Sequence, residues 1–133
     1  MPYAITWETD GLLWTYRGVV TGAELLRSNQ EIYGDPRFDE IAWQIVDLSG
    51  VERLEANADD MAVIAANDLA AGRSNPYIRV AVVVRDEAGR KISAQYEAAI
   101  AGSPWRQRIF ESIEAALAWA RQPRVPLRGG PGK

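Results

Sequence analysis

Two nearly continuous apolar runs constrain the fold of this chain more than any other feature. One covers residues 41–48, and the other covers residues 78–84, where the sequence is Ile-Arg-Val-Ala-Val-Val-Val. Strands with apolar residues at consecutive positions are usually buried on both faces, as in parallel sheets covered by helices. Each run is followed by a segment in which apolar residues have helical spacing. The two runs therefore predict parallel strands of an α/β sheet.

The N-terminal residues predict an antiparallel hairpin. Apolar side chains alternate along residues 3–8, which is typical of a strand with one buried face. Asp10-Gly11 is a dipeptide favoured in tight hairpin turns. Residues 12–18 are rich in aromatic and other β-favouring side chains, so we expect a second strand there that pairs with the first.

Four helices and one more strand complete the pattern. Thr21 and Glu24 fit a capping box at the start of the first helix. Asn57 and Ser112 are placed to cap two later helices. The helices after the first are expected over residues 58–71, where Gly72 ends the helix, over residues 89–101, and from residue 113 to just before Pro123. A short strand is expected over residues 107–110.

The resulting order, ββαβαβαβα, predicts a single α/β domain over residues 1–121. Its five-stranded mixed sheet would be covered by the four helices. Residues 122–133 contain three prolines, three glycines and the basic residues Arg124, Arg128 and Lys133. We expect this segment to be a flexible basic tail.

The composition excludes several classes of chemistry. The chain has no cysteine and no histidine, so thiol nucleophiles, disulfides, imidazole metal ligands and Ser-His-Asp triads are impossible. We expect no metal or other cofactor. The net charge of −3 argues against a nucleic-acid partner. No segment has the roughly 20 apolar residues of a membrane span, and the N-terminus lacks a signal-peptide pattern, so we expect a cytoplasmic bacterial protein.

Four short motifs resemble those of the STAS and SpoIIAA-like domains, which share the anti-sigma-factor-antagonist fold. They are Val-Asp-Leu-Ser-Gly-Val at residues 46–51, Arg-Val-Ala-Val-Val-Val at residues 79–84, the Arg-x-x-x-Phe strand at residues 106–110 and the Ala-x-x-x-Trp helix at residues 115–119. The resemblance covers most of residues 1–121. It implies the STAS/SpoIIAA-like fold and, by analogy with lipid-carrying domains of related fold, an apolar ligand.

The chain departs from this family at its regulatory serine. Antagonist proteins of the family carry a D-S-S-G-like segment whose serine opens a helix and is phosphorylated. The matching residues here are Glu55-Ala56-Asn57-Ala58, and neither middle position has a hydroxyl. We therefore expect no phosphorylation switch at this position, although Glu55 and Asn57 remain candidate binding residues. Ser49 is the nearest hydroxyl and is expected in the turn after its strand.

Charged residues lie at two expected strand ends, where an anion site and a phosphorylation site are the possible functions. Arg85, Arg90 and Lys91 surround Gly89 near the start of a helix, where an anion binds favourably. The alternative is a solvated charged turn. Asp47 ends a strand as in phospho-accepting receiver domains, but the other residues of that site are missing. We expect Asp47 to accept hydrogen bonds from neighbouring loop amides.

Aromatic residues supply the remaining candidates. Trp14 and Tyr16 have the opposite parity to Leu13 on their strand, so they line either the core or the wall of a binding pocket. Tyr96 lies on the apolar face of its helix. Trp105 follows a Ser-Pro pair and is expected to be an exposed, functional aromatic of a loop.

Three functions fit these observations. The first is a small, non-enzymatic regulatory or protein-binding module, dimeric through its N-terminal hairpin. The second is a carrier of a small apolar or amphipathic ligand, held between the sheet and the helices at residues 57–72 and 89–101. The third is an enzyme that works without histidine or cysteine. An apolar surface patch would favour the first, an enclosed apolar cavity the second, and a cleft with carboxyl groups of raised pKa the third.

Overall fold

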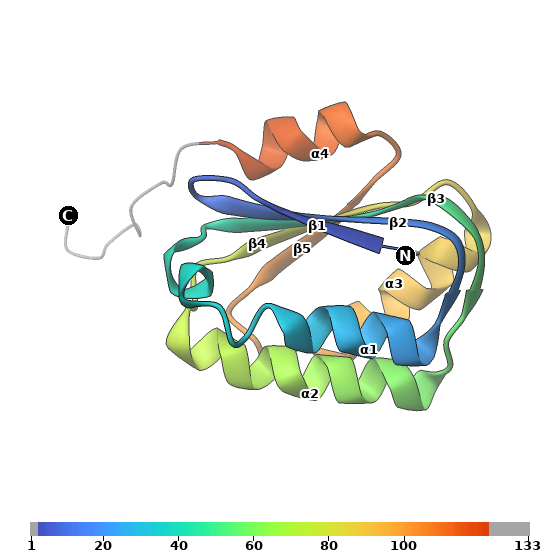
Figure 1. Ribbon diagram of the computed structural model, residues 1–133, viewed down its shortest axis with the longest axis horizontal. Helices are drawn as coiled ribbons and strands as arrows, with labels where there is room; N and C mark the ends of the chain where they lie inside the picture. Colours follow the sequence, from blue (N-terminus) through green and yellow to red (C-terminus); the bar gives the residue numbers. More distant parts are fainter. Residues whose placement is uncertain (1–2, 123–133) are drawn as a thin grey trace.

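The five strands form one mixed sheet in the order β1-β2-β3-β4-β5 (Figure 1). The computed structural model describes residues 3–122. The strands are β1 (Tyr3–Trp7), β2 (Gly11–Thr21), β3 (Trp43–Glu55), β4 (Arg79–Val83) and β5 (Arg106–Phe110). β1 pairs with β2 antiparallel, and all other neighbouring strands are parallel. The predicted hairpin and the predicted five-stranded mixed sheet are confirmed. The tail prediction for residues 123–133 lies outside the described residues.

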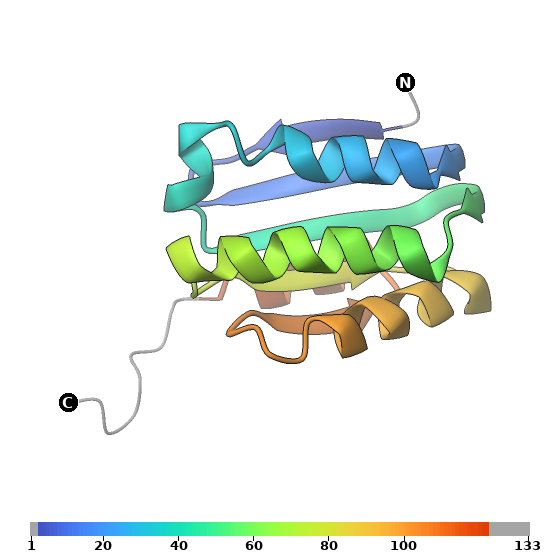
Figure 2. The same ribbon diagram turned by 90° about the horizontal axis from the view of Figure 1, so that it is seen from below.

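The helices cover the two faces of the sheet unequally. Three of them, α1 (Gly22–Glu31), α2 (Ala58–Ser74) and α3 (Glu87–Ala99), lie side by side on one face (Figures 1 and 2). The last helix, α4 (Ile113–Ala120), lies on the opposite face. A short 3-10 helix, η1 (Pro36–Glu40), precedes β3. We call the side with α1, α2 and α3 the inner layer and the side with α4 the outer layer.

Three of the four predicted helix starts are confirmed. Thr21 and Glu24 form a capping box at α1, and Asn57 forms one with Asp60 at α2. The Ser112 hydroxyl accepts a hydrogen bond from a backbone N–H at the start of α4. Because each cap satisfies backbone N–H groups that have no partner within the helix, these residues fix where the helices begin. The exception among the four is α3, which begins at Glu87 rather than Gly89 because the Asp86 side chain caps it two residues earlier. It ends at Ala99.

The outer layer is closely packed. Its buried residues are Trp43, Ile45, Ala81, Val83, Ala116 and Ala120. The Trp43 ring covers Gly11 on the neighbouring strand, where a Cβ atom would lie only 1.9 Å from the ring. Glycine is therefore required at residue 11, which was predicted to lie in the hairpin turn and is the first residue of β2.

β3 is longer than the sequence predicted, and this corrects the place of Ser49. The prediction ended the strand near residue 48 and put Ser49 in the following turn. β3 instead continues to Glu55 and stays paired with β2, whose register shifts twice along this stretch. Gly18 has φ of 68° at the second shift, which suits glycine. The apolar run ends early because residues 49–55 have only β2 beside them and are largely exposed.

α2 also extends beyond its predicted end. Gly72 was expected to stop the helix but lies inside it, and Asn75 is the C-cap residue. The backbone of Gly72 is approached by Pro104, Ser103 and the Trp105 indole, all within 3.6 Å of where a Cβ would be. This glycine therefore serves close packing rather than helix termination.

Candidate functional site

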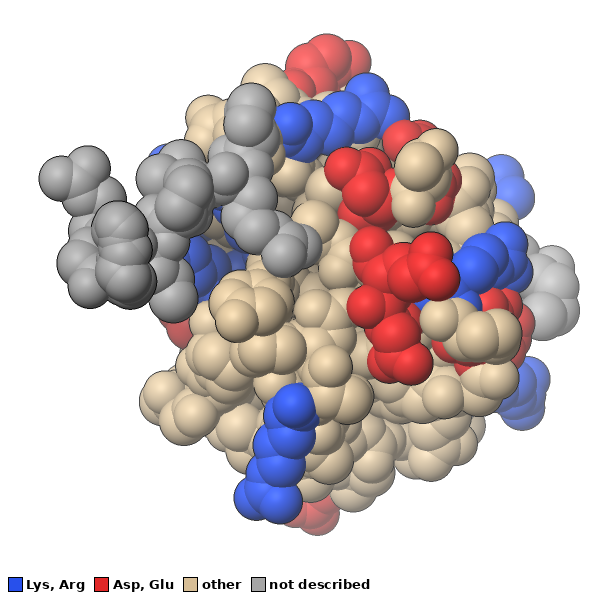
Figure 3. Space-filling model, turned by 90° about the vertical axis from the view of Figure 1, so that its left-hand side faces the viewer, with Lys and Arg blue, Asp and Glu red and all other residues tan. Residues whose placement is uncertain are grey.

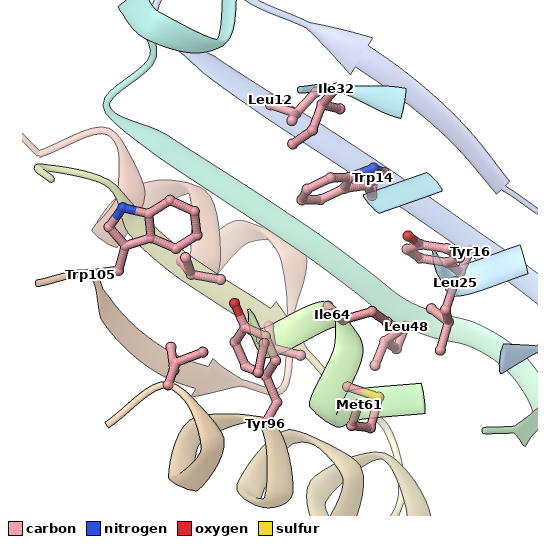
Figure 4. Close-up of a cluster of buried hydrophobic side chains, with 14 of the residues drawn as sticks. Leu12, Trp14, Tyr16, Leu25, Ile32, Leu48, Met61, Ile64, Tyr96 and Trp105 are labelled. Atoms are coloured by element: carbon pink, nitrogen blue, oxygen red, sulfur yellow. The ribbon is translucent and has the colours of Figure 1, made fainter. Parts of the chain in front are cut away.

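A small cavity lies between the sheet and the helices of the inner layer. Its volume is about 80 Å³. Figure 4 shows the side chains of this layer converging from β2, α1, α2 and α3. Its walls are mainly apolar and are formed by Leu25, Val46, Leu48, Leu54, Met61, Ile64, Val80, Val82 and Ile92. The cavity therefore lies where the carrier hypothesis expected a ligand.

Four buried polar atoms at this cavity have no hydrogen-bond partner. They are Trp14 Nε1, Gln44 Nε2, Ser93 Oγ and Gln107 Oε1, and they are all the buried side-chain atoms without a partner found within residues 3–122. All four residues line the cavity. Trp14, Gln44 and Ser93 are each at most 4% exposed. Since buried polar groups in native proteins almost always have partners, this concentration is unusual.

The strand register explains how these groups come together. Gln44 on β3 pairs with Val80 on β4, and Val80 pairs with Gln107 on β5, so the three side chains form one row on the inner face. Trp14 lies on β2, next to β3. The Gln107 side-chain Nε2 donates to the backbone carbonyl of Ser93 at 3.2 Å, which leaves Gln107 Oε1 as an unused acceptor.

A buried carboxyl group, Asp68, borders the same cavity. Asn29 Nδ2 donates to Asp68 Oδ1 at 2.9 Å. The Tyr33 hydroxyl donates to Oδ1, and the Tyr96 hydroxyl donates to Oδ2. No lysine or arginine is among the described residues that line the cavity. Asp68 thus has three donors and no cation beside it.

Burial changes the acid–base behaviour of this cluster. Desolvation raises the pKa of Asp68 above its ordinary value, and the hydrogen bonds from Tyr33, Tyr96 and Asn29 act in the opposite direction. Desolvation and the nearby Asp68 carboxyl also raise the pKa of Tyr33 and Tyr96, so both hydroxyls keep their protons and remain donors. Desolvation likewise raises the pKa of Tyr16, whose hydroxyl lies 2.5 Å from Ser28 Oγ.

The structure places some of the predicted aromatic residues at the cavity. Tyr96, Trp14 and Tyr16 all line it. Trp105 does not, and the prediction that it is exposed is wrong. It is 5% exposed, and its indole N–H donates to the Asn75 carbonyl at 2.7 Å. The loop folds inward because this bond satisfies the indole N–H while the ring joins the core beside Phe38.

The family-derived candidates lie elsewhere. Asn57 caps α2 at the predicted helix start, whereas Glu55 is still the last residue of β3 because this strand is longer than predicted. Neither residue lines the cavity. Ser49 donates its hydroxyl and its backbone N–H to Asp47 Oδ1, at 2.6 and 3.0 Å. Asp47 therefore accepts hydrogen bonds as predicted, but within a strand rather than in a loop.

The basic candidates do not converge on one point. Arg85 donates to the Val51 carbonyl at 3.3 Å, whereas Arg90 pairs with Glu111 at 2.5 Å. Lys91 is exposed. The N-terminus of α3 is already capped by the Asp86 carboxylate, which accepts from Gly89 N. An anion at this helix start would have to displace that carboxylate.

Acidic side chains gather on the end of the molecule that carries η1 and the β1–β2 turn (Figure 3). Asp35 caps η1, and its ion pair with Arg37 at 2.7 Å lowers the pKa of Asp35 to about 2. No group of three acidic side chains within residues 3–122 is arranged to hold a metal ion. Capping and surface charge account for this cluster.

Sequence reasoning missed Asp68, Gln44, Ser93 and Gln107. Two of these residues could have been recognised from the sequence pattern. Asp68 continues the inward stripe of α2 after Met61, Ile64 and Ala65 at helical spacing, so its carboxyl had to face the core. Gln44 interrupts the apolar run of β3. A polar residue at a position predicted to be buried indicates a functional or structural hydrogen bond.

Comparison with known proteins supports the fold. No protein-family model matches this chain, and no curated protein matches it. Among solved structures, it is similar to an uncharacterized protein of the DUF3478 family with a SpoIIAA-like fold from Shewanella loihica PV-4. The TM-score is 0.50 at 18% identity, over 89% of this chain and 91% of the other. This chain has a SpoIIAA-like fold.

The SpoIIAA-like fold confirms the resemblance drawn from the four sequence motifs. At this level of identity the likeness concerns the fold, so the function has to be argued from the cavity and its residues. Within residues 3–122, none of the helices is both long and apolar enough to cross a membrane.

Proposed function

We propose that this protein is a binding module that holds a small, mainly apolar molecule in the inner-layer cavity. The observation that carries the proposal is that the four residues with buried, unpartnered polar atoms all line one apolar cavity. Leaving such a group unpaired costs about 1–3 kcal/mol, so a sequence that keeps four of them at one place implies an occupant that pairs with them.

The size of the cavity limits the occupant. A volume of about 80 Å³ corresponds to two or three water molecules at roughly 30 Å³ each, and an engineered cavity of roughly 150 Å³ is known to bind benzene. The space therefore suits a molecule of only a few non-hydrogen atoms, or the polar end of a larger one. An apolar wall with a few polar groups is the usual composition of a small-molecule site.

The protein-partner hypothesis has less support within the described residues. The exposed large apolar side chains are Val19 on β2, Val63 on α2 and Tyr77 in the segment before β4. They belong to three different elements, and no other large apolar side chain within residues 3–122 is exposed enough to contribute to the apolar patch that usually marks an interface.

The enzyme hypothesis rests on Asp68 alone. Its raised pKa and its position at the cavity resemble those of a catalytic acid. However, both carboxyl oxygens already accept hydrogen bonds from Asn29, Tyr33 and Tyr96. A group held in this way positions the helices around the cavity, and it supports binding more than proton transfer.

Native mass spectrometry of freshly purified protein tests the proposal. We expect a reproducible non-covalent adduct of low mass that is lost when Val80→Phe fills the cavity. Val63→Phe makes the same change on the exposed side of α2 and should keep the adduct. The absence of any adduct, together with no saturable binding of small-molecule probes, would contradict the proposal. An adduct that survives Val80→Phe would place the binding site elsewhere.

A further inference from the structure

The unpartnered atoms at the cavity are of two kinds, and this restricts the ligand. The indole Nε1 of Trp14 can only donate a hydrogen bond. Gln107 Oε1 can only accept one, and its orientation is fixed because Nε2 of the same side chain donates to the Ser93 carbonyl. The Ser93 hydroxyl can do either. An occupant that satisfies the cavity must therefore offer both an acceptor and a donor.

These two kinds of group lie at opposite sides of the cavity. Trp14 and Gln44 are on the adjacent strands β2 and β3, whereas Gln107 is on β5 and contacts Ser93 of α3. Val80 separates Gln44 from Gln107 in the same row. Two strand spacings of about 4.8 Å place the backbones of the two glutamines roughly 10 Å apart. The ligand therefore needs polar groups at two ends and an apolar middle over Val80.

The charge around the cavity disfavours an ionised ligand. Asp68 is the only carboxyl group among the described residues that line it, and these residues include no lysine or arginine. A carboxylate or phosphate would be buried without a cation and close to a second acid, which is costly. An ammonium group would lose its hydration on burial, and both carboxyl oxygens of Asp68 already accept hydrogen bonds from the protein. It also has no lone pair with which to accept from Trp14 Nε1.

We propose that the cavity selects an uncharged ligand with a hydrogen-bonding group at each end of a short apolar chain, such as a diol or a hydroxy-amide. This inference rests on the proposed binding function and names its ligand class. An acceptor at one end would pair with Trp14 Nε1, and a hydroxyl or amide N–H at the other would donate to Gln107 Oε1. Molecules of this class lose little hydration energy on burial compared with ions of the same size.

A matched set of three-carbon probes tests the inference. The set consists of 1,3-propanediol, 3-aminopropan-1-ol, 3-hydroxypropionate and 1-propanol, which differ mainly in charge and in the number of polar ends. Binding is followed by NMR through the indole N–H signal of Trp14, assigned by its absence in Trp14→Phe. We expect 1,3-propanediol to bind on the order of 10-fold more tightly than either charged probe and more tightly than 1-propanol.

Two variants make the test specific for the acceptor end. Gln107→Met removes the unpartnered oxygen at similar size and should abolish the advantage of 1,3-propanediol over 1-propanol. Gln95→Met makes the same change at an exposed position of α3 and should preserve that advantage. If Gln107→Met does not fold, Ser93→Ala provides a second, smaller change at the same end and should reduce the advantage in the same direction.

The outcomes separate the ligand class from the binding function itself. Equal or tighter binding of a charged probe would overturn the inference and leave the binding function standing. If none of the probes binds, the inference about the ligand class is also wrong. The presence or absence of the adduct in native mass spectrometry then tests the binding function separately. A cavity that holds only water, with no adduct and no probe binding, would contradict both.

Discussion

The two layers of this molecule use the same sheet in different ways. On the outer side, α4 packs against residues such as Trp43 and Val83 with no unpartnered buried side-chain atom among the described residues of that layer. On the inner side, three helices cover a larger area and leave a cavity of about 80 Å³ with four such atoms. Adjacent residues of one strand, such as Trp43 and Gln44, belong to the two different layers.

The difference indicates that the polar groups of the inner layer are not an unavoidable result of this fold. The same strands bury only apolar residues in the hydrophobic cluster on their other face, so an apolar residue in place of Gln44 is compatible with the architecture. We infer that the outer layer is packed for stability alone, whereas the inner layer, which holds the larger hydrophobic core, gives up part of its stability to keep a binding site.

The largest expected contrast is between two buried tryptophans, one in each layer. Trp43→Ala should reduce the free energy of unfolding by about 4–5 kcal/mol, at the upper end for such substitutions, because the ring packs on Gly11 and its N–H donates to Asp10. Trp14→Ala should cost about 3 kcal/mol, at the lower end for such substitutions, since its ring borders a cavity and its N–H has no partner within the protein. Urea unfolding measures both; equal costs would contradict the contrast between the layers.

Adding a methylene on each face of β4 gives the next largest contrast. Val83→Leu enlarges a side chain in the closely packed outer layer and should cost about 1–3 kcal/mol. Val82→Leu, one residue earlier, adds the same group beside the cavity and should be close to neutral. Thermal and urea unfolding of the two variants provide the comparison. A larger cost for Val82→Leu would show that the inner layer has no spare space.

The raised pKa of Asp68 predicts that the free energy of unfolding depends on pH through a group in the inner layer. Because burial raises its folded-state pKa, the folded protein binds this proton more tightly than the unfolded chain does. The contribution of Asp68 is therefore greatest at low pH and is lost as the pH rises from about 3.8, its ordinary value, through the raised folded pKa. Relative to Asp68→Asn, the wild type should lose stability over this interval.

The measurement is urea unfolding of both proteins from about pH 3, which lies below the ordinary Asp68 pKa of 3.8, up to about pH 8. Asp35 also titrates at low pH, but it is common to both proteins and cancels in the difference. Parallel stability curves for the wild type and Asp68→Asn would show that the Asp68 pKa is not raised on folding.

Ser93→Ala should have the smallest effect on the free energy of unfolding. Whether that free energy rises or falls shows whether the Ser93 hydroxyl has a hydrogen-bond partner in the free protein. The substitution removes a buried hydroxyl without a partner, so the free protein should be unchanged or more stable by up to about 1 kcal/mol. Ser112→Ala, which removes the cap of α4, is the matched control and should be destabilising by about 1 kcal/mol. A clear loss of stability for Ser93→Ala would indicate a hydrogen bond to this hydroxyl in the free protein.

Much of the fold follows from local patterns in the sequence. The capping residues Thr21, Asn57 and Ser112 predicted three helix starts correctly, because a cap acts within its own first turn. The continuation of β3 to Glu55 was missed, because it depends on pairing with β2 rather than on apolar pattern. Gly72 was misjudged for a similar reason, since its role is contact with a distant loop.

The site was less predictable than the fold. The place of the cavity between the sheet and two helices was anticipated, and so was Tyr96. Its four unpartnered polar groups come from four separate elements, β2, β3, α3 and β5, and only the three-dimensional register brings Trp14, Gln44 and Gln107 to one cavity. Trp105 was predicted to be exposed because Ser-Pro indicates a loop, whereas its burial depends on the carbonyl of Asn75.

The central claim is that the unpartnered atoms of the inner layer are paired by a bound molecule. A high-resolution crystal structure of freshly purified protein, without added small molecules, tests this most directly. The account predicts density for a small non-water molecule in the cavity, within hydrogen-bonding distance of Trp14 Nε1 and Gln107 Oε1. A cavity that is empty, or that contains only ordered water molecules bonded to these atoms, would contradict it.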